Sequence, residues 1–295
     1  MVFTNKKELT GLLGNPWANR LGLHVFRIIA SDLMCWLRRL PFAALDYSAY
    51  KQFSQEGIVV IEGFLEEDDF KLVCHEVYSG LENAPLLEPE CVAGFGQKKF
   101  HQQGFDRYDG SSLNRFVHIE NNSKITRALI SKKMNELTLV LFGLINKKAK
   151  YYIYELRHGD HRANHDRQKD THKDTFHHTY KLWYFIEEVT LEAGALEYAQ
   201  GSHRSTWARL KWEYQMSCQV SQEKNHPNRG GAFRISDAEL QKINTQPLRK
   251  LLVKANSIVI VDTRGFHRRG DAAMNTKRLS IYANFRPWAF WPFVH

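Results

Sequence analysis

The pattern of apolar and polar positions divides the chain into a helical first half and a strand-rich second half. Apolar side chains recur at helical spacing over four segments, which we predict to be helices: 21–40, 46–56, 66–81 and 123–144. A β-branched run, Ile58-Val-Val-Ile61, interrupts them and predicts a strand. Segment 86–112 has weak periodicity and many Gly, Gln and aromatic residues, so we predict a loop there.

Short strand-like runs dominate after residue 150. We predict strands at 151–156, 182–189, 195–199, 251–253, 258–261 and 279–285, with one helical insertion at 206–214. No helix alternates regularly with these strands, which disfavours a parallel doubly wound sheet and favours an all-β barrel or sandwich. We therefore expect a mainly β core with flanking helices, organised as an N-terminal helical extension (1–45) and one domain (46–295).

The most apolar early stretch, residues 21–40, contains Arg27 and Asp32, so no uncharged run is long enough to cross a membrane. As a helix it is amphipathic, and two interpretations stay open. It packs on the main domain, or it lies as a basic helix on an anionic membrane surface. The N-terminus lacks the pattern of a secretory signal. We therefore expect a cytoplasmic protein, which the second interpretation places at the inner face of the membrane.

Composition adds limits rather than a function. The 295 residues are 43% hydrophobic, which is enough to fill a core, and the formal net charge of +9 favours anionic partners. The four scattered cysteines form no CxxC pair and fit a reducing compartment. Basic residues are dispersed and no DNA-binding motif is present, so we expect no nucleic-acid partner. The sequence leaves the oligomeric state open.

Histidines gather where the chemistry is expected, with six of the fourteen in residues 157–180. His172 and Asp174 point to one face if the backbone there is extended. A third ligand is available at His267, just past a buried-looking strand. Two imidazoles and one carboxylate form the facial triad that holds non-haem Fe(II), although zinc accepts the same ligands. A second His-x-Asp triplet begins at His158, so the triplet alone is a weak signal.

An arginine on a later strand strengthens the iron interpretation. Arg278 stands eleven residues after His267, and Ser280 faces the same way on a strand. A guanidinium binds a carboxylate through two parallel hydrogen bonds, and a hydroxyl adds a third. An iron centre beside such an arginine is what a 2-oxo acid cosubstrate requires.

The chain resembles the phytanoyl-CoA dioxygenase family of Fe(II)/2-oxoglutarate-dependent oxygenases from about residue 47 to residue 287. Four blocks carry the resemblance, in the family's order. They are Gly57-Ile-Val-Val-Ile-Glu-Gly-Phe64, then His172-x-Asp174 with Lys181-Leu-Trp-Tyr-Phe, then Glu192 to Arg204 with its Gly-Ser-His ending, and Asp262-Thr-Arg-Gly-Phe-His267 with Arg278.

The resemblance implies a double-stranded β-helix (jelly-roll) core with helices packed outside. It also implies that the three ligands named above hold Fe(II) and that Arg278 anchors the distal carboxylate of 2-oxoglutarate. Trp183 and Ser280 are expected beside this cosubstrate. Asp174 stands where halogenating relatives have a small residue, so hydroxylation or a related C–H oxidation by O2 is expected, with release of succinate and CO2.

Substrate identity is only bounded by the sequence. Cations near the expected mouth favour a small acidic or lipid-linked metabolite, and they are Arg264, Arg268, Arg269, Lys98, Lys99 and His101. The alternatives are a zinc hydrolase using the same site, a non-catalytic jelly-roll binding protein and a nucleic-acid demethylase. The hydrolase leaves Arg278 without a role, and the binding protein is disfavoured because every ligand is present.

Overall fold

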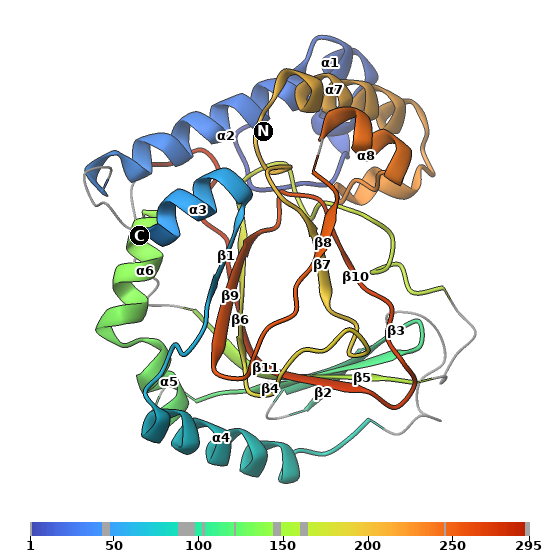
Figure 1. The fold of residues 1–295 in the computed structure, drawn as a ribbon. Helices are drawn as coiled ribbons and strands as arrows, with labels where there is room; N and C mark the ends of the chain where they lie inside the picture. Colours follow the sequence, from blue (N-terminus) through green and yellow to red (C-terminus); the bar gives the residue numbers. More distant parts are fainter. Residues whose placement is uncertain are drawn as a thin grey trace.

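The computed structural model describes residues 2–42, 48–87, 98–101, 104–120, 122–143, 149–159, 165–244 and 246–292. Within these ranges a large antiparallel sheet faces a small one (Figure 1). The large sheet runs β1 (Ile58–Ile61), β9 (Ser257–Asp262), β6 (Tyr180–Phe185), β11 (Lys277–Phe285), β5 (Tyr151–His158), β4 (Ser112–His118), β3 (Gly104–Asp109) and β2 (Lys98–His101). The small sheet runs β10 (His267–Arg269), β7 (Leu196–Ala199) and β8 (Leu248–Lys250). The predicted fold class, a jelly-roll core with flanking helices, is confirmed, although the sheet does not close.

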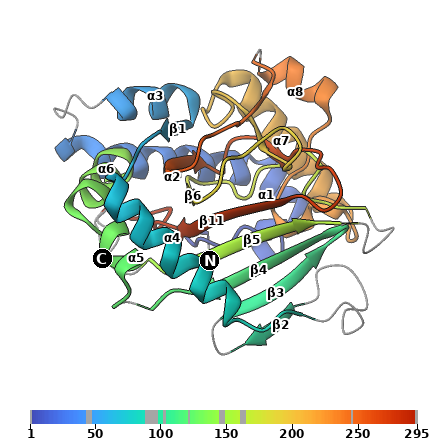
Figure 2. The same cartoon turned by 60° about the horizontal axis from the view of Figure 1, so that its bottom comes forward.

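Helices cover one face and one end of this core. They are α1 (Pro16–Arg20), α2 (Leu23–Arg39), α3 (Ser48–Glu56), α4 (Glu67–Glu82), α5 (Lys124–Leu129), α6 (Lys132–Phe142), α7 (Trp207–Gln222) and α8 (Asp237–Ile243). Helices α3 to α6 lie along the outer face of the large sheet, and α4 lies below the sheet in Figure 1 and in front of it in Figure 2. Helices α1, α2, α7 and α8 gather at the opposite end (Figure 1).

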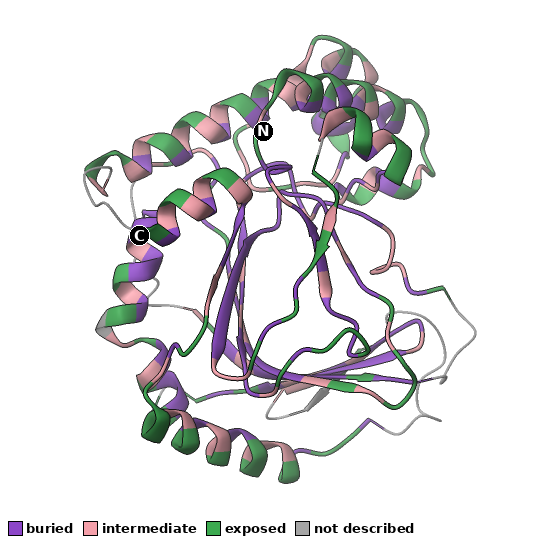
Figure 3. Ribbon diagram, viewed as in Figure 1, coloured by how far each residue is buried: buried purple, intermediate pink, exposed green. Residues whose placement is uncertain are grey.

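Alternation along the central strands sorts side chains between a hydrophobic core and the interior of the jelly roll. On β11 the apolar members Leu279, Ile281, Ala283 and Phe285 pack outward against the helices, in the largest buried cluster. The polar members between them, beginning with Arg278, face inward. Strand β9 is buried on both faces, purple in Figure 3. On β11 the inward members Arg278, Tyr282 and Asn284 are only partly buried, because they line a cavity inside the jelly roll.

Some predicted elements are corrected by the structure. The predicted helix 123–144 is two helices, because Ser131 leaves the helical region with ψ 164° and starts α6. The predicted loop 86–112 contains strands β2 and β3, which pair as an antiparallel hairpin. At 251–253 there is only an isolated bridge between Val253 and Val189, and strand β8 precedes it.

One turn fixes where the first strand starts. Gly57 ends α3 with φ +78°, a left-handed conformation that side chains disfavour. A Cβ there would lie 2.3 Å from the hydroxyl oxygen of Tyr198 and 2.5 Å from Nδ1 of His203. The Gly57 carbonyl then accepts the backbone N–H of Asp262 at 2.8 Å, so the turn holds the end of β9.

Three described cysteines, Cys35, Cys74 and Cys218, are free thiols, while Cys91 lies outside the described residues. Over the described ranges, every helix is too short or too polar to pass through a bilayer.

Candidate active site

The His-x-Asp triplet is extended, which is the condition under which its two side chains share a face. His172 and His267 exchange backbone hydrogen bonds of 3.0 and 2.9 Å, forming an isolated antiparallel bridge. The Asp174 N–H donates to the carbonyl of Thr263 at 2.9 Å. Extended backbone places the side chains of residues 172 and 174 on one face and that of Lys173 on the other. The bridge also explains why a residue so distant in the chain joins them.

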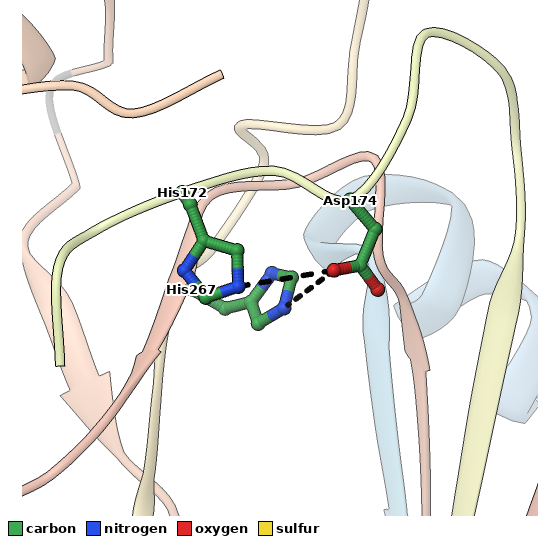
Figure 4. Close-up of side chains that lie close together, drawn as sticks. All are labelled: His172, Asp174 and His267. Atoms are coloured by element: carbon green, nitrogen blue, oxygen red, sulfur yellow. Dashed lines mark ion pairs between the residues drawn. The ribbon is translucent and has the colours of Figure 1, made fainter. Parts of the chain in front are cut away.

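The three predicted ligands converge on one point (Figure 4). Nε2 of His172 and Nε2 of His267 each lie 3.8 Å from Oδ1 of Asp174. One ligand atom from each residue lies within 4.8 Å of the other two, and this is the one metal-compatible group of His, Cys, Asp and Glu found among the described residues. Both imidazoles are buried, with 4% of each residue exposed.

Backbone carbonyls orient both imidazoles. Nδ1 of His172 lies 2.7 Å from the carbonyl oxygen of Asp170, and Nδ1 of His267 lies 2.9 Å from that of Gly265. A carbonyl only accepts, so each Nδ1 carries the proton and each Nε2 presents its lone pair to the centre of the triad. This is the outer hydrogen-bonding that metal-binding histidines need.

The charges of the triad suit a divalent cation. Burial, followed by the repulsion of His267, lowers the pKa of His172 to about 3, and burial also lowers the pKa of His267. Burial opposes ionisation of Asp174, but Lys181 and the two imidazoles hold its pKa well below the usual range. Lys181 Nζ lies 2.7 Å from Oδ2 of Asp174, which leaves Oδ1 directed at the histidines. Two neutral imidazoles and one carboxylate with free lone pairs fit a non-haem Fe(II) site, and they fit zinc equally in donor type.

A cavity of about 480 Å³ opens beside the triad and is strongly cationic. Eight lysine and arginine side chains line it and Asp174 is its only acidic lining residue among those described. The cations are Lys7, Lys98, Arg107, Lys181, Arg268, Arg269, Arg278 and Arg286. Such a chamber concentrates anions.

Arg278 lies in this cavity with the triad. Its Nη1 donates to the carbonyl of Gly194 at 2.6 Å, and Tyr154, on the paired strand β5, lies beside the guanidinium. Trp183 also lines the cavity, and its buried indole N–H has no partner among the described residues. Ser280 shares the strand with Arg278, but it is fully buried and does not line the cavity.

The cations predicted around the mouth divide into several groups. Arg268 and Arg269 line the cavity, although each already binds a carboxylate: Arg268 that of Glu197 at 2.6 Å and Arg269 that of Asp166 at 2.8 Å. The prediction for Arg264 is wrong. Its guanidinium is buried away from the cavity.

Arg264 instead binds Asp32 and Ser205, because a carboxylate on α2 offers it a closer partner than the cavity does. Of the predicted lid residues, Lys98 lines the cavity and Lys99 does not. The side chain of His101 lies outside the described residues.

Several lining residues were missed from the sequence. Lys181 precedes Trp183 by two on the same strand, so alternation was a usable signal for it. Lys7 gave no signal, because it lies 167 residues before Asp174, whose carbonyl it binds at 2.8 Å. The segment that carries Lys7 is held by Arg27, which donates to the carbonyls of Thr4 and Lys6.

An ion network supports the back of the triad. Lys173 is completely buried between the two ligands, and its Nζ lies 2.7 and 2.8 Å from the two carboxylate oxygens of Glu213. Arg209 and His24 bind the same carboxylate at 3.0 and 2.9 Å. The triplet is thereby fixed from both faces, to His267 on one side and to α7 on the other.

No curated protein matches the chain. Among solved structures, the chain is similar to the non-haem epimerase SnoN from nogalamycin biosynthesis, with 14% identity, TM-score 0.44 and 81% of each chain covered. It is also similar to HygX from Streptomyces hygroscopicus with nickel and 2-oxoglutarate bound, with 15% identity, TM-score 0.46, and 83% of this chain and 88% of that one covered.

These structural similarities are too weak to assign an activity. The sequence comparison is more specific, because the family model described as phytanoyl-CoA dioxygenase (PhyH) matches residues 53–271, well over half of the chain. That range includes the whole triad but ends before Arg278. The chain belongs to the phytanoyl-CoA dioxygenase family of non-haem iron, 2-oxoglutarate-dependent oxygenases.

Proposed function

We propose that this protein hydroxylates, or otherwise oxidises at a C–H bond, a small acidic metabolite that is free or linked to a lipid. The observation that carries the proposal is the meeting of three metal-binding side chains with a guanidinium in one cationic cavity. When bound, Fe(II) with 2-oxoglutarate supplies the oxidising power, using O2 and releasing succinate and CO2.

Each residue has a defined task in this proposal. His172, Asp174 and His267 hold the iron through Nε2, Oδ1 and Nε2, and the backbone carbonyls behind the imidazoles keep the protons on Nδ1. Arg278 binds the distal carboxylate of 2-oxoglutarate through its fork of N–H donors. The indole N–H of Trp183, which has no partner within the described part of the chain, is a donor available to an oxygen in the cavity, and this supports a place beside the cosubstrate.

The charge of the cavity supports an acidic substrate. Eight cations line it, against Asp174 as the one acidic lining residue among those described. Four of these cations already bind carboxylates, and they are Arg107, Lys181, Arg268 and Arg269. The other four remain for bound anions, and 2-oxoglutarate neutralises only two of their charges. Lys7 and Arg286 lie beside Asp174. Burial and the repulsion of nearby cations, Arg286 and Lys181, lower the pKa of Lys7 by more than the attraction of Asp174 raises it. An anionic group on the substrate relieves this repulsion. A cytoplasmic location with peripheral contact at residues 21–40 belongs to the same proposal.

The test is succinate release with Fe(II), 2-oxoglutarate and a panel of acidic metabolites matched to their neutral amides or esters. His172→Ala is expected to abolish turnover. Arg278→Gln is expected to weaken 2-oxoglutarate binding by about 2–5 kcal/mol, the usual cost of removing one partner of a buried charge pair. Lys277→Gln is the matched control, since Lys277 lies next to Arg278 on the other face of β11 and is half-exposed.

Two outcomes oppose the proposal. Equal turnover of neutral and acidic substrates would contradict the proposal that the substrate is acidic. Turnover that needs zinc and not 2-oxoglutarate replaces the oxygenase by a hydrolase built on the same ligands.

A further inference from the structure

Helix α2 presents its apolar side to the outside of the molecule. At about 100° per residue, five large apolar side chains fall within an arc of about 80°. Each is between 44% and 58% exposed. We call them the α2 outer face, and they are Phe26, Ile29, Leu33, Trp36 and Leu40. A helix packed on a domain ordinarily turns such a stripe inward.

The opposite side of α2 is buried and mostly polar, with Ile28 and Cys35 among its polar side chains. His24 binds Glu213 at 2.9 Å, and Arg27 donates to the carbonyls of Thr4 and Lys6 at 2.8 and 2.7 Å. Further along, Arg38 donates to the carbonyls of Trp288 and Trp291 at 2.8 and 2.9 Å. Turning the helix to bury its apolar side would remove the hydrogen-bond partners of these charged groups. The outward direction of the stripe is therefore fixed by the fold.

Neighbouring segments also expose apolar side chains. On α1 and just after it, Trp17 is 70% and Leu21 is 88% exposed. The half-exposed ring of Phe3 packs edge-on against Phe26, with ring centroids 6.2 Å apart. Trp288, held beside the end of α2 by Arg38, is also exposed. A surface with this many exposed tryptophans matches the composition of membrane interfaces, where an apolar ring meets polar headgroups.

The charge around this surface is positive. Residues 9–42 contain four arginines and one acidic residue, Asp32, whose carboxylate is already bound by Arg264. The buried guanidinium groups of Arg27 and Arg38 bond backbone carbonyls, which leaves their charge in place. Arg20 is exposed beside Trp17, 5.4 Å from the centroid of its ring. An approaching membrane therefore contacts exposed apolar side chains in a region of positive electrostatic potential.

We propose that the α2 outer face docks on an anionic lipid surface, with the helix lying in the plane of the headgroups. Apolar side chains enter the acyl boundary while the arginines attract the lipid charge, as in other interfacial helices. Pairing with a second copy is disfavoured, since a two-fold axis would bring the positive potential of one copy against that of the other. The inference deepens the membrane contact in the proposed function, and it does not depend on the oxidation chemistry, because no α2 residue lines the cavity among those described.

The experiment is vesicle flotation of the full chain with phosphatidylcholine alone and with added phosphatidylglycerol. We expect flotation with the anionic vesicles, weakened by salt. Leu33→Glu is expected to lower binding by roughly tenfold or more, the loss when one leucine no longer enters an apolar phase. Leu72→Glu is the matched control: Leu72 is 46% exposed against 49% for Leu33, but it lies on α4 at the opposite end of the molecule (Figure 1).

A second measurement does not depend on the folding of the glutamate variant. Brominated lipids are expected to quench the tryptophan fluorescence of the wild-type chain, and Trp36→Phe is expected to reduce that quenching. Absence of flotation, equal loss in Leu33→Glu and Leu72→Glu, or a dimer that Leu33→Glu dissociates would overturn the proposal. Succinate formation from 2-oxoglutarate is measured on the same variants without vesicles. This control tests the proposed activity independently of membrane binding.

Discussion

Glu213→Gln tests whether the ion network behind the triad determines its stability. The carboxylate is buried and binds three side chains, with Lys173 at 2.7 Å, Arg209 at 3.0 Å and His24 at 2.9 Å. Burial opposes its ionisation, but Lys173 and Arg209 hold the pKa of Glu213 well below the usual range. The amide keeps the shape of the side chain and removes the charge, which leaves two buried cations without a counterion.

Breaking a buried ion pair from one side costs about 3–5 kcal/mol. We therefore expect the free energy of unfolding, measured by urea denaturation, to fall by about this amount. Fe(II) affinity should fall as well, because Lys173 lies between His172 and Asp174. Glu62→Gln is the control, since its pair with Lys254 is exposed and such pairs contribute about 0–1 kcal/mol. A loss in Glu213→Gln no larger than in the control would refute this reasoning.

Three further outcomes are expected. Lys181→Met should weaken Fe(II) binding about 10–100-fold in a competition titration, because it frees the Asp174 oxygen that is turned away from the metal site. Asp262 raises the pKa of His178 to about 10 against the effect of burial. The contribution of this pair to the free energy of unfolding should therefore be complete below about pH 6.5 and decrease as the pH rises towards 10. His178→Gln should remove this pH dependence. Gly57→Ala should cost at least about 2 kcal/mol in urea denaturation, from positive φ and overlap with Tyr198.

Part of the candidate triad was predictable because the directions of its side chains follow local rules. An extended backbone places residues i and i+2 on one face, so His172 and Asp174 could be paired from the sequence alone. The same rule applied to β11 places Arg278 inside the jelly roll. It also placed Ser280 there, but the fully buried hydroxyl lies outside the cavity, since alternation sets the face of a strand and not the depth of a side chain.

Other features depend on partners that are distant in the chain. Lys7 enters the cavity because Arg27 holds its segment, and neither residue carries a local pattern that indicates this. Arg264 was expected at the mouth, but Asp32 on α2 binds it elsewhere. The helical pattern across 123–144 continues through Ser131, where the backbone nevertheless turns, because apolar spacing is preserved on both sides of the break.

The central claim is that His172, Asp174 and His267 hold Fe(II) while Arg278 receives 2-oxoglutarate. The most direct measurement is the visible absorption of the anaerobic protein on addition of Fe(II) and then 2-oxoglutarate. The account predicts a metal-to-ligand charge-transfer band that is absent in His267→Ala and needs more 2-oxoglutarate in Arg278→Gln. A wild-type chain without the band, or a band that His267→Ala retains, would contradict it.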